Sequence, residues 1–169
     1  MSYTEEQIAN LVHPTKVHRK VYTDPEIFDL EMERIWARTW IYIGHESQVP
    51  EKGNYLTLNY GKVPVVMVRD NDDNVRVLHN RCGHKGAKLV DKPCGKIPAF
   101  RCCYHGWRFR LDGKLLGVPH MAGYAGTDFD KDDPQYSMQK LRSESLRGFV
   151  FATMNDDVPD LRTWMGGAA

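Results

Sequence analysis

The chain has 169 residues, of which 41% are hydrophobic and 27% charged, and its formal net charge is +1 at pH 7. This length and composition suffice for one folded domain with a buried core and exclude an intrinsically disordered chain. The near-neutral charge argues against a nucleic-acid partner or a membrane surface, and no apolar stretch is long enough for a bilayer span or a signal peptide. We therefore expect a cytoplasmic protein.

The first predicted element is an amphipathic helix that begins near residue 24 and ends near residue 38. Asp24 is a suitable N-cap, and Pro25 suits the first helical position. The apolar face of this helix follows the spacing i, i+4, i+7 and i+8, with Phe28, Met32, Ile35 and Trp36.

Beyond residue 40 the pattern changes to that of short β-strands. Runs rich in β-branched and aromatic residues alternate with turn sequences such as residues 70–74 and 112–113. The expected strands are residues 40–43, 55–60, 65–69, 75–79, 107–111 and 148–154. Strands of this length and spacing predict a mainly β fold, an antiparallel β-sandwich.

Two short motifs give the clearest functional signal. Cys82 and His84 form a C-x-H pair, and after seventeen intervening residues Cys102 and His105 form a C-x2-H pair. Two thiolates with two imidazoles suit a Rieske [2Fe-2S] cluster, in which histidines replace two of the cysteines on one iron. The same four ligands could also close a tetrahedral zinc site, so the ligand types alone leave both metals open.

The residues around these motifs resemble a known family. Residues 80–87 (NRCGHKGA) and 100–109 (FRCCYHGWRF) resemble the two cluster loops of the Rieske non-haem iron oxygenases. Residues 22–28, 35–40 and 44–50 resemble the N-terminal segment of the alpha subunit of aromatic-ring-hydroxylating members. The resemblance runs from about residue 20 to the end of the chain.

This resemblance implies a fold, a cofactor and a role. The fold is the Rieske iron–sulfur-protein sandwich, in which two loops hold one [2Fe-2S] cluster. Cys82 and Cys102 would hold the inner iron, and His84 and His105 the outer iron. The domain would relay electrons from a ferredoxin or reductase to a mononuclear iron outside this chain, as part of a ring-hydroxylating oxygenase.

The same resemblance suggests how the chain is organised. We expect residues 1–39 to form an N-terminal segment, residues 40–155 the Rieske domain, and residues 156–169 the start of a crossover into a catalytic domain absent from this sequence. The full-length protein is expected to form a trimer of alpha subunits, with or without a beta subunit.

No second metal site is expected within the chain. An oxygen-activating non-haem iron needs two histidines and a carboxylate with open positions. Asn10, His13 and His18 imitate the spacing of such a motif, but Pro14 interrupts them and no partner carboxylate is evident. The remaining histidines are expected at the surface or hydrogen-bonded, namely His45, His79 and His120. We therefore expect no catalytic residue here, and mononuclear Fe(II) only in the absent domain.

Two further cysteines lie outside the proposed ligand set. Cys94 and Cys103 are expected to be free thiols, with Cys103 acting as a small buried residue, and a disulfide between them is the alternative.

Basic residues are concentrated around the motifs. Residues 81–110 contain eight basic residues and one acidic residue, a net charge of +7. These charges form either a solvated rim or a docking collar for an acidic ferredoxin or reductase.

The loop residues also predict a redox potential. The resemblance implies that respiratory-chain relatives carry a disulfide between the loops and hydroxyl groups near the sulfurs. At the matching places this chain has Ala87, Tyr104, Trp107 and Phe109. Fewer donors to sulfur leave the reduced cluster less stabilised, so we expect a low, oxygenase-type potential.

Two other functions remain open from the sequence. One is a free-standing Rieske ferredoxin, against which the helix at residues 24–38 argues, because a minimal carrier does not need it. The other is an interaction module stabilised by zinc.

Overall fold

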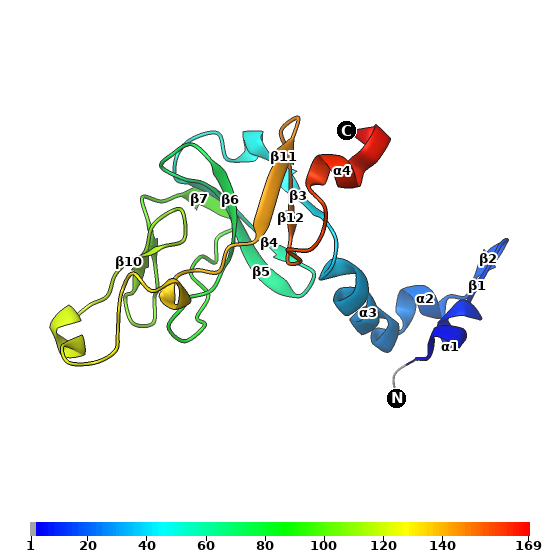
Figure 1. The fold of residues 1–169 in the computed structure, drawn as a ribbon, viewed down its shortest axis with the longest axis horizontal. Helices are drawn as coiled ribbons and strands as arrows, with labels where there is room; N and C mark the ends of the chain where they lie inside the picture. Colours follow the sequence, from blue (N-terminus) through cyan, green and yellow to red (C-terminus); the bar gives the residue numbers. More distant parts are fainter. Residues whose placement is uncertain (1–2) are drawn as a thin grey trace.

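Antiparallel β-sheet dominates the structure, a computed structural model that describes residues 3–169 (Figure 1). Three sheets form the body, and a helical segment from the N-terminus extends away from it. The mainly β class expected from the sequence is confirmed.

The central sheet has four strands in the order β6-β5-β4-β7. Its strands are β4 (Asn54–Tyr60), β5 (Val63–Arg69), β6 (Val75–His79) and β7 (Cys94–Lys96). Residues 65–68 of β5 are all fully buried. Alternate side chains of a strand point to opposite faces, so both faces of this sheet are covered at β5.

A three-stranded sheet covers one face of the central sheet. Its order is β11-β12-β3, with β3 (Ile41–His45), β11 (Arg142–Leu146) and β12 (Phe149–Thr153). Val65 and Met67 of β5 pack there with Ile43 of β3 and Val150 of β12. These contacts form the first of two main core clusters.

A smaller sheet covers the opposite face. Its order is β10-β9-β8, with β8 (Phe100–Arg101), β9 (Arg108–Phe109) and β10 (Leu115–Gly117). We call it the small sheet. Phe100 and Phe109 pack with Val66 and Val68 of β5 in the second core cluster. The two predicted cysteine ligands belong to the same cluster, so the candidate metal centre is built on this core.

The N-terminal segment contacts the body at its last residues, where the Tyr60 hydroxyl donates to the Trp36 carbonyl, and its first part extends away from the sheets (Figure 1). It comprises α1 (Glu5–Ala9), β1 (Val12–His13), β2 (Lys16–Val17), α2 (Lys20–Thr23), α3 (Pro25–Glu31) and a π-helical turn, η1 (Met32–Trp36). The predicted helix start is confirmed, because Asp24 accepts a hydrogen bond from the Glu26 amide and Pro25 is the first helical residue.

Only part of the predicted apolar face of this helix is covered, so the prediction of a continuous buried face is corrected. Phe28 and Ile35 are 46% and 55% exposed, whereas Ile27 is buried. The Ala37 amide donates to the Met32 carbonyl, a bond to the fifth preceding residue that widens the turn. The wider turn moves Ile35 and the side chains that follow out of the expected register. Phe28 precedes the turn, and its exposed ring lies 5.2 Å from the Lys62 ammonium.

Short helices complete the chain. They are η2 (Glu46–Gln48), η3 (Met121–Tyr124), η4 (Pro134–Tyr136), α4 (Leu161–Met165) and η5 (Gly166–Ala168). Trp40, Val158 and Leu161 form a third core cluster, and the Trp40 indole donates a 2.9 Å hydrogen bond to the Pro159 carbonyl. No helix among residues 3–169 has the length and apolar character needed to cross a bilayer.

Candidate metal centre

The first predicted loop begins where β6 ends. Asn80 is buried there, and its side-chain oxygen accepts hydrogen bonds from the amides of Leu89 and Val90 at 3.2 and 3.0 Å. Its side-chain nitrogen donates to the Val90 carbonyl at 2.7 Å. Asn80 thus joins the two ends of the loop. The motif contained this residue, but its positioning role depends on a contact ten residues away that the spacing did not indicate.

Backbone hydrogen bonds close this loop around Cys82. The Cys82 amide donates to the Ala87 carbonyl at 2.8 Å, and the Gly86 amide donates to the Cys82 carbonyl at 3.0 Å. Gly86 has a φ of 75°, a left-handed conformation that glycine adopts without strain.

The second loop, between β8 and β9, closes in the same way. The Cys102 amide donates to the Trp107 carbonyl at 2.8 Å, and the Gly106 amide donates to the Cys102 carbonyl at 3.1 Å. Gly106 has a φ of 71°. The two predicted cysteines therefore occupy equivalent positions in two equivalent loops.

The thiols of Cys82 and Cys102 are both buried, each 3% exposed. Burial raises the pKa of Cys82, and the neighbouring Cys102 raises it further, whereas the backbone amides of His84 and Lys85 act to lower it. Two buried thiols facing one another are unfavourable as a pair of free thiolates. Amides directed at the sulfur suit a thiolate whose charge is neutralised by a metal.

The imidazoles of His84 and His105 lie together on the outer side of the thiols. Their ring centroids are 4.8 Å apart, with 67° between the planes. His105 is exposed and His84 is partly exposed. The Tyr104 ring stacks on His105 at 3.8 Å. The four predicted ligands thus come together as a buried thiol pair and an outer imidazole pair.

Trp107 packs against the predicted ligand His84 from the side of the protein core. Its indole is 3% exposed and stacks on His84, with centroids 4.6 Å apart and only 6° between the planes. Phe129 and Tyr136 contact the same indole edge-on, at 5.7 and 6.0 Å. Trp107 was expected only to lack a hydroxyl, and its packing role depends on residues distant in the sequence.

A segment at residues 134–140, which we call the strap, runs beside the first loop. A side chain at Gly83 would meet the carbonyl oxygen of Tyr136 at 2.4 Å, so the strap's approach requires glycine there. Elsewhere a cavity of about 260 Å³ lies between the strap and the first loop. It is lined by His79, Gln135, Ser137 and residues of the loop.

His79 differs from its expected state. Its Nε2 atom is buried and has no hydrogen-bond partner among residues 3–169, although a surface or hydrogen-bonded histidine was expected. Burial lowers the pKa of His79, and the positive charge of Arg81 lowers it further. Both effects favour the neutral form of the ring. The sequence missed this because the burial comes from loop and strap residues brought together by the fold.

The other candidate residues lie apart from this centre. Asn10, His13 and His18 are in the N-terminal segment, which extends away from the loops (Figure 1). His45 Nδ1 lies 2.9 Å from the Ser47 hydroxyl, and His120 is exposed.

The remaining cysteines are both free and exposed. Exposure of Cys103 corrects the expectation that it would be a small buried residue. Its backbone lies in the tip of the second loop, where Cys102 turns inward and the next three side chains face solvent.

The donor set suits a two-iron cluster. The predicted ligands lie as two buried thiols and two imidazoles nearer the surface, which is the division that a Rieske cluster needs.

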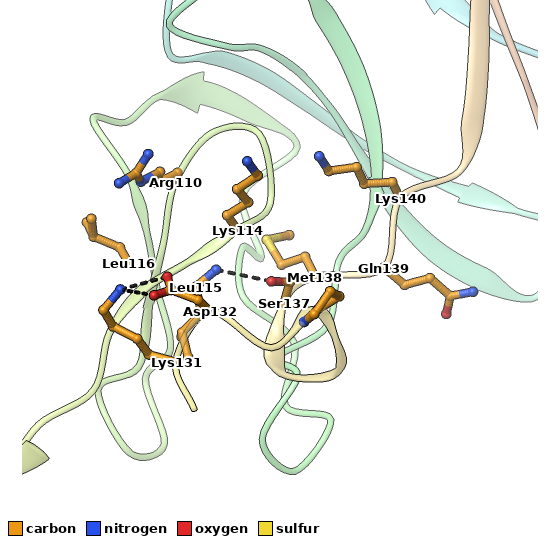
Figure 2. Close-up of a pocket in the computed structure, with 11 residues that line it drawn as sticks. Arg110, Lys114, Leu115, Leu116, Lys131, Asp132, Ser137, Met138, Gln139 and Lys140 are labelled. Atoms are coloured by element: carbon orange, nitrogen blue, oxygen red, sulfur yellow. Dashed lines mark hydrogen bonds and ion pairs between the residues drawn. The ribbon is translucent and has the colours of Figure 1, made fainter. Parts of the chain in front are cut away.

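A second cavity, of about 540 Å³, lies on the strap beside the small sheet (Figure 2). Ser137 and Gln139 line both this cavity and the one at the first loop. Its floor contains Leu115 and Met138, and none of the four predicted ligands reaches it. We call it the groove.

Comparison with known proteins agrees with this geometry. The sequence profile of the Rieske [2Fe-2S] domain matches residues 39–137. The chain is 36% identical over 173 residues to the biphenyl dioxygenase alpha subunit of Paraburkholderia xenovorans strain LB400, covering 99% of this chain and 38% of that one. It is 40% identical over 150 residues to the toluate 1,2-dioxygenase alpha subunit of Pseudomonas putida, covering 88% of this chain and 33% of that one.

Solved structures give the same result. A naphthalene 1,2-dioxygenase variant bound to phenanthrene has a TM-score of 0.87 and 32% identity, over 100% of this chain and 37% of that one. The quaternary ammonium Rieske monooxygenase CntA, in complex with an inhibitor, has a TM-score of 0.78 and 31% identity, over 88% of this chain and 40% of that one. The chain thus spans well under half the length of these proteins.

Proposed function

The chain belongs to the Rieske [2Fe-2S] domain family, and from this membership we propose that it is the electron-relay domain of an aromatic-ring-hydroxylating oxygenase alpha subunit. The relatives named as dioxygenase alpha subunits align with it over 88–99% of its length. Their names also support an aromatic substrate for the whole protein.

We propose Cys82 and Cys102 as ligands of the inner iron, and His84 and His105 as ligands of the outer iron. Burial of both thiols beside the core, and the contact between both imidazoles on the outer side, support this assignment. When bound, the cluster supplies a site that takes up and releases one electron at a time.

The observation that carries the proposal is the opposite exposure of the two ligand pairs. The thiol pair is shielded by the core, whereas His105 is open to solvent and His84 partly so. Electrons would therefore pass through the imidazole edge. The chain's own contribution is to hold both rings in fixed orientations by stacking, with Trp107 against His84 and Tyr104 against His105.

The rest of the protein follows as a wider proposal. Residues 40–155 would form the Rieske domain, preceded by the segment at 1–39 and followed by a crossover at 156–169. The receiving mononuclear iron would lie in a catalytic domain of the alpha subunit. A ferredoxin or reductase would supply the electrons, and alpha subunits, with or without beta subunits, would form the oligomer.

Metal analysis of the purified chain tests the proposed cluster. We expect two irons and two labile sulfides per chain, with the visible absorption of a Rieske centre. Cys82→Ser should abolish this absorption, whereas Cys94→Ser, at an exposed free thiol, should leave it unchanged. Stoichiometric zinc without visible absorption would refute the proposal and favour the zinc module.

An assay of product formation tests whether the chain relays electrons without hydroxylating a substrate itself. The loaded chain, supplied with dithionite, oxygen and a panel of aromatic acids, should form no hydroxylated product, because the proposed role is electron relay alone. Turnover would show that a reactive iron site exists within the chain.

A further inference from the structure

Two arginines face each other at the base of the second loop. Arg101 of β8 pairs directly with Arg108 of β9, and both side chains are exposed. The neighbouring pair, Phe100 and Phe109, points the other way into the core. Like charges directly opposite one another on adjacent strands are destabilising. The sheet therefore carries an unfavourable pair at the position nearest to the loop.

Open space adjoins this pair. Gly117 of β10 is the partner of Arg108 on the other side of the small sheet, and a side chain there would meet nothing within 4 Å. A cavity of about 270 Å³ is lined by both arginines together with Gly106, Val118 and Pro119. The two guanidinium groups thus border a recess that reaches the residue next to His105.

No acidic side chain among residues 3–169 pairs with either arginine. Other cations of the basic 81–110 segment do have partners. Lys88 pairs with Asp91 at 3.3 Å, and Lys96 pairs with Glu51 at 2.6 Å. Among residues 3–169, Arg81, Lys85, Lys92 and Arg110 of this segment also have no acidic partner, but Arg101 and Arg108 are the two that lie directly opposite one another on paired strands.

The basic surface continues into the groove. Arg110 follows Arg108 by two residues just after the end of β9, and both arginines are exposed while Phe109 between them is buried. Figure 2 shows the side chains of Arg110, Lys114 and Lys140 extending to the same side of the groove, while Lys131 is directed at Asp132. The first three have no acidic partner within the described residues.

We propose that the outward face of the small sheet is the docking surface for the acidic protein that delivers electrons to this domain. Carboxylates of that protein would bind between Arg101 and Arg108, since a guanidinium binds a carboxylate through two parallel hydrogen bonds. An apolar side chain beside those carboxylates would enter the groove, above Leu115 and Leu116. This inference rests on the proposed electron-relay function and specifies the partner's contact site.

The position of the arginines favours a redox partner over a free anion. The recess that they line includes Gly106, and the exposed His105 and Tyr104 precede it in the same loop. A protein bound across the arginines would therefore lie next to the imidazole edge through which electrons would enter. Charges at such a surface mainly raise the rate of association.

Replacing Arg101 by threonine separates this role from a structural one. Threonine suits a strand and removes the repulsion, so Arg101→Thr should keep or raise the thermal midpoint of unfolding. The same change should lower the second-order rate of reduction by a reduced acidic [2Fe-2S] ferredoxin about tenfold at low ionic strength. A residue with a purely structural role would instead lower stability and rate together.

Stopped-flow reduction of the loaded chain, with titration calorimetry of the oxidised ferredoxin, measures both effects. Lys16→Thr is the matched control, because it removes one positive charge from β2 in the N-terminal segment, away from the small sheet (Figure 1). Reduced methyl viologen, a small cation, should reduce the wild type and both variants at rates within twofold.

Each outcome separates the two proposals. Failure to form a Rieske centre would refute the electron-relay function itself. The docking surface alone would be refuted if the cluster is intact and reduced normally by methyl viologen, but Arg101→Thr and Lys16→Thr have equal ferredoxin rates and affinities. If both variants are slowed equally, only the net charge of the protein matters, and not the position of the charge, so the docking surface is refuted in that case as well.

Discussion

The indole of Trp107, in the second loop, lies flat against the imidazole of His84, in the first. This contact links two segments that backbone hydrogen bonds close separately. Because Trp107 is buried against Phe129 and Tyr136 as well, it connects the outer imidazole pair to the core. Orientation of His84 therefore depends on a residue outside its own loop.

Removal of this indole should cost both stability and cluster retention. We expect Trp107→Ala to lower the free energy of unfolding by about 3–5 kcal/mol, the usual range for a buried large aromatic. The half-life of the visible absorption under a chelator should shorten. Trp164→Ala, at a 44% exposed indole, is the control and should change neither value appreciably. Equal chelator sensitivity of the two variants would contradict a supporting role for Trp107.

The midpoint potential should lie at the low end of the Rieske range of about −150 to +300 mV. Trp107 and Phe109 offer no hydroxyl, and Tyr104 is 63% exposed with its ring stacked on His105. Fewer donors to the sulfurs leave the reduced cluster less stabilised, which lowers the potential. Protein-film voltammetry at pH 7 measures the midpoint. A midpoint well above zero at pH 7 would contradict the expectation.

Two neighbouring lysines should differ in their effect on electron uptake. Lys85 has no acidic partner among residues 3–169, whereas Lys88 pairs with Asp91. Charge reversal at Lys85 should therefore reduce the association rate of an acidic donor more than reversal at Lys88, without altering the cluster spectrum. Both rates should fall as salt rises, because screening acts over about 10 Å at 0.1 M. An association rate that does not change between low and high salt would show that both lysines are only solvated surface charges.

Asp70 should make folding sensitive to acid. Its carboxylate is 1% exposed, and although burial opposes the charge, a 2.8 Å contact with Arg76 and bonds from the Asn74 and Asp72 amides hold its pKa below the usual value. A depressed carboxyl pKa gives stability that is full above the unfolded-state value, about 3.9, and is lost as pH falls through the folded-state value.

Asp70→Asn should accordingly lower the free energy of unfolding at pH 7 by about 1–3 kcal/mol. The difference from wild type should shrink below about pH 4, as the wild-type carboxyl becomes protonated. Denaturant titrations at pH 3 and pH 7 give both numbers. Asp72→Asn is a fitting control, since that side chain is exposed on the same turn. A pH-independent difference would show that packing, not charge, is responsible.

Strong local patterns in the sequence were enough to place most of the central sheet. The strand predicted at residues 75–79 coincides with β6, and those predicted at 55–60 and 65–69 lie within β4 and β5. Strands that are buried on one or both faces favour β-branched residues, and this enrichment made the three strands recognisable in the sequence. Among the strands that were missed is β11, whose sequence RSESL contains one apolar residue and no buried residue.

The candidate site was foreseen only as far as ligand types and spacing allow. The meeting of Cys82 with Cys102, and of His84 with His105, follows that prediction. The supporting contacts of Asn80 and the strap's approach to Gly83 join residues ten or more than fifty positions apart. Likewise, the pairing of two arginines across the small sheet depends on strand register, which no local pattern specifies.

The equivalence of the two loops has a consequence for protein engineering. Cys82 and Gly86 recur twenty positions later as Cys102 and Gly106, with the same backbone bonds, yet the histidines are twenty-one positions apart. The two loops therefore have equal length from cysteine to glycine, and the histidine of the second loop lies one position later within it, which breaks the pseudo-symmetry. Because main-chain bonds form the shared scaffold of both loops, an engineered exchange of the two histidine offsets would move the imidazole while leaving those bonds in place.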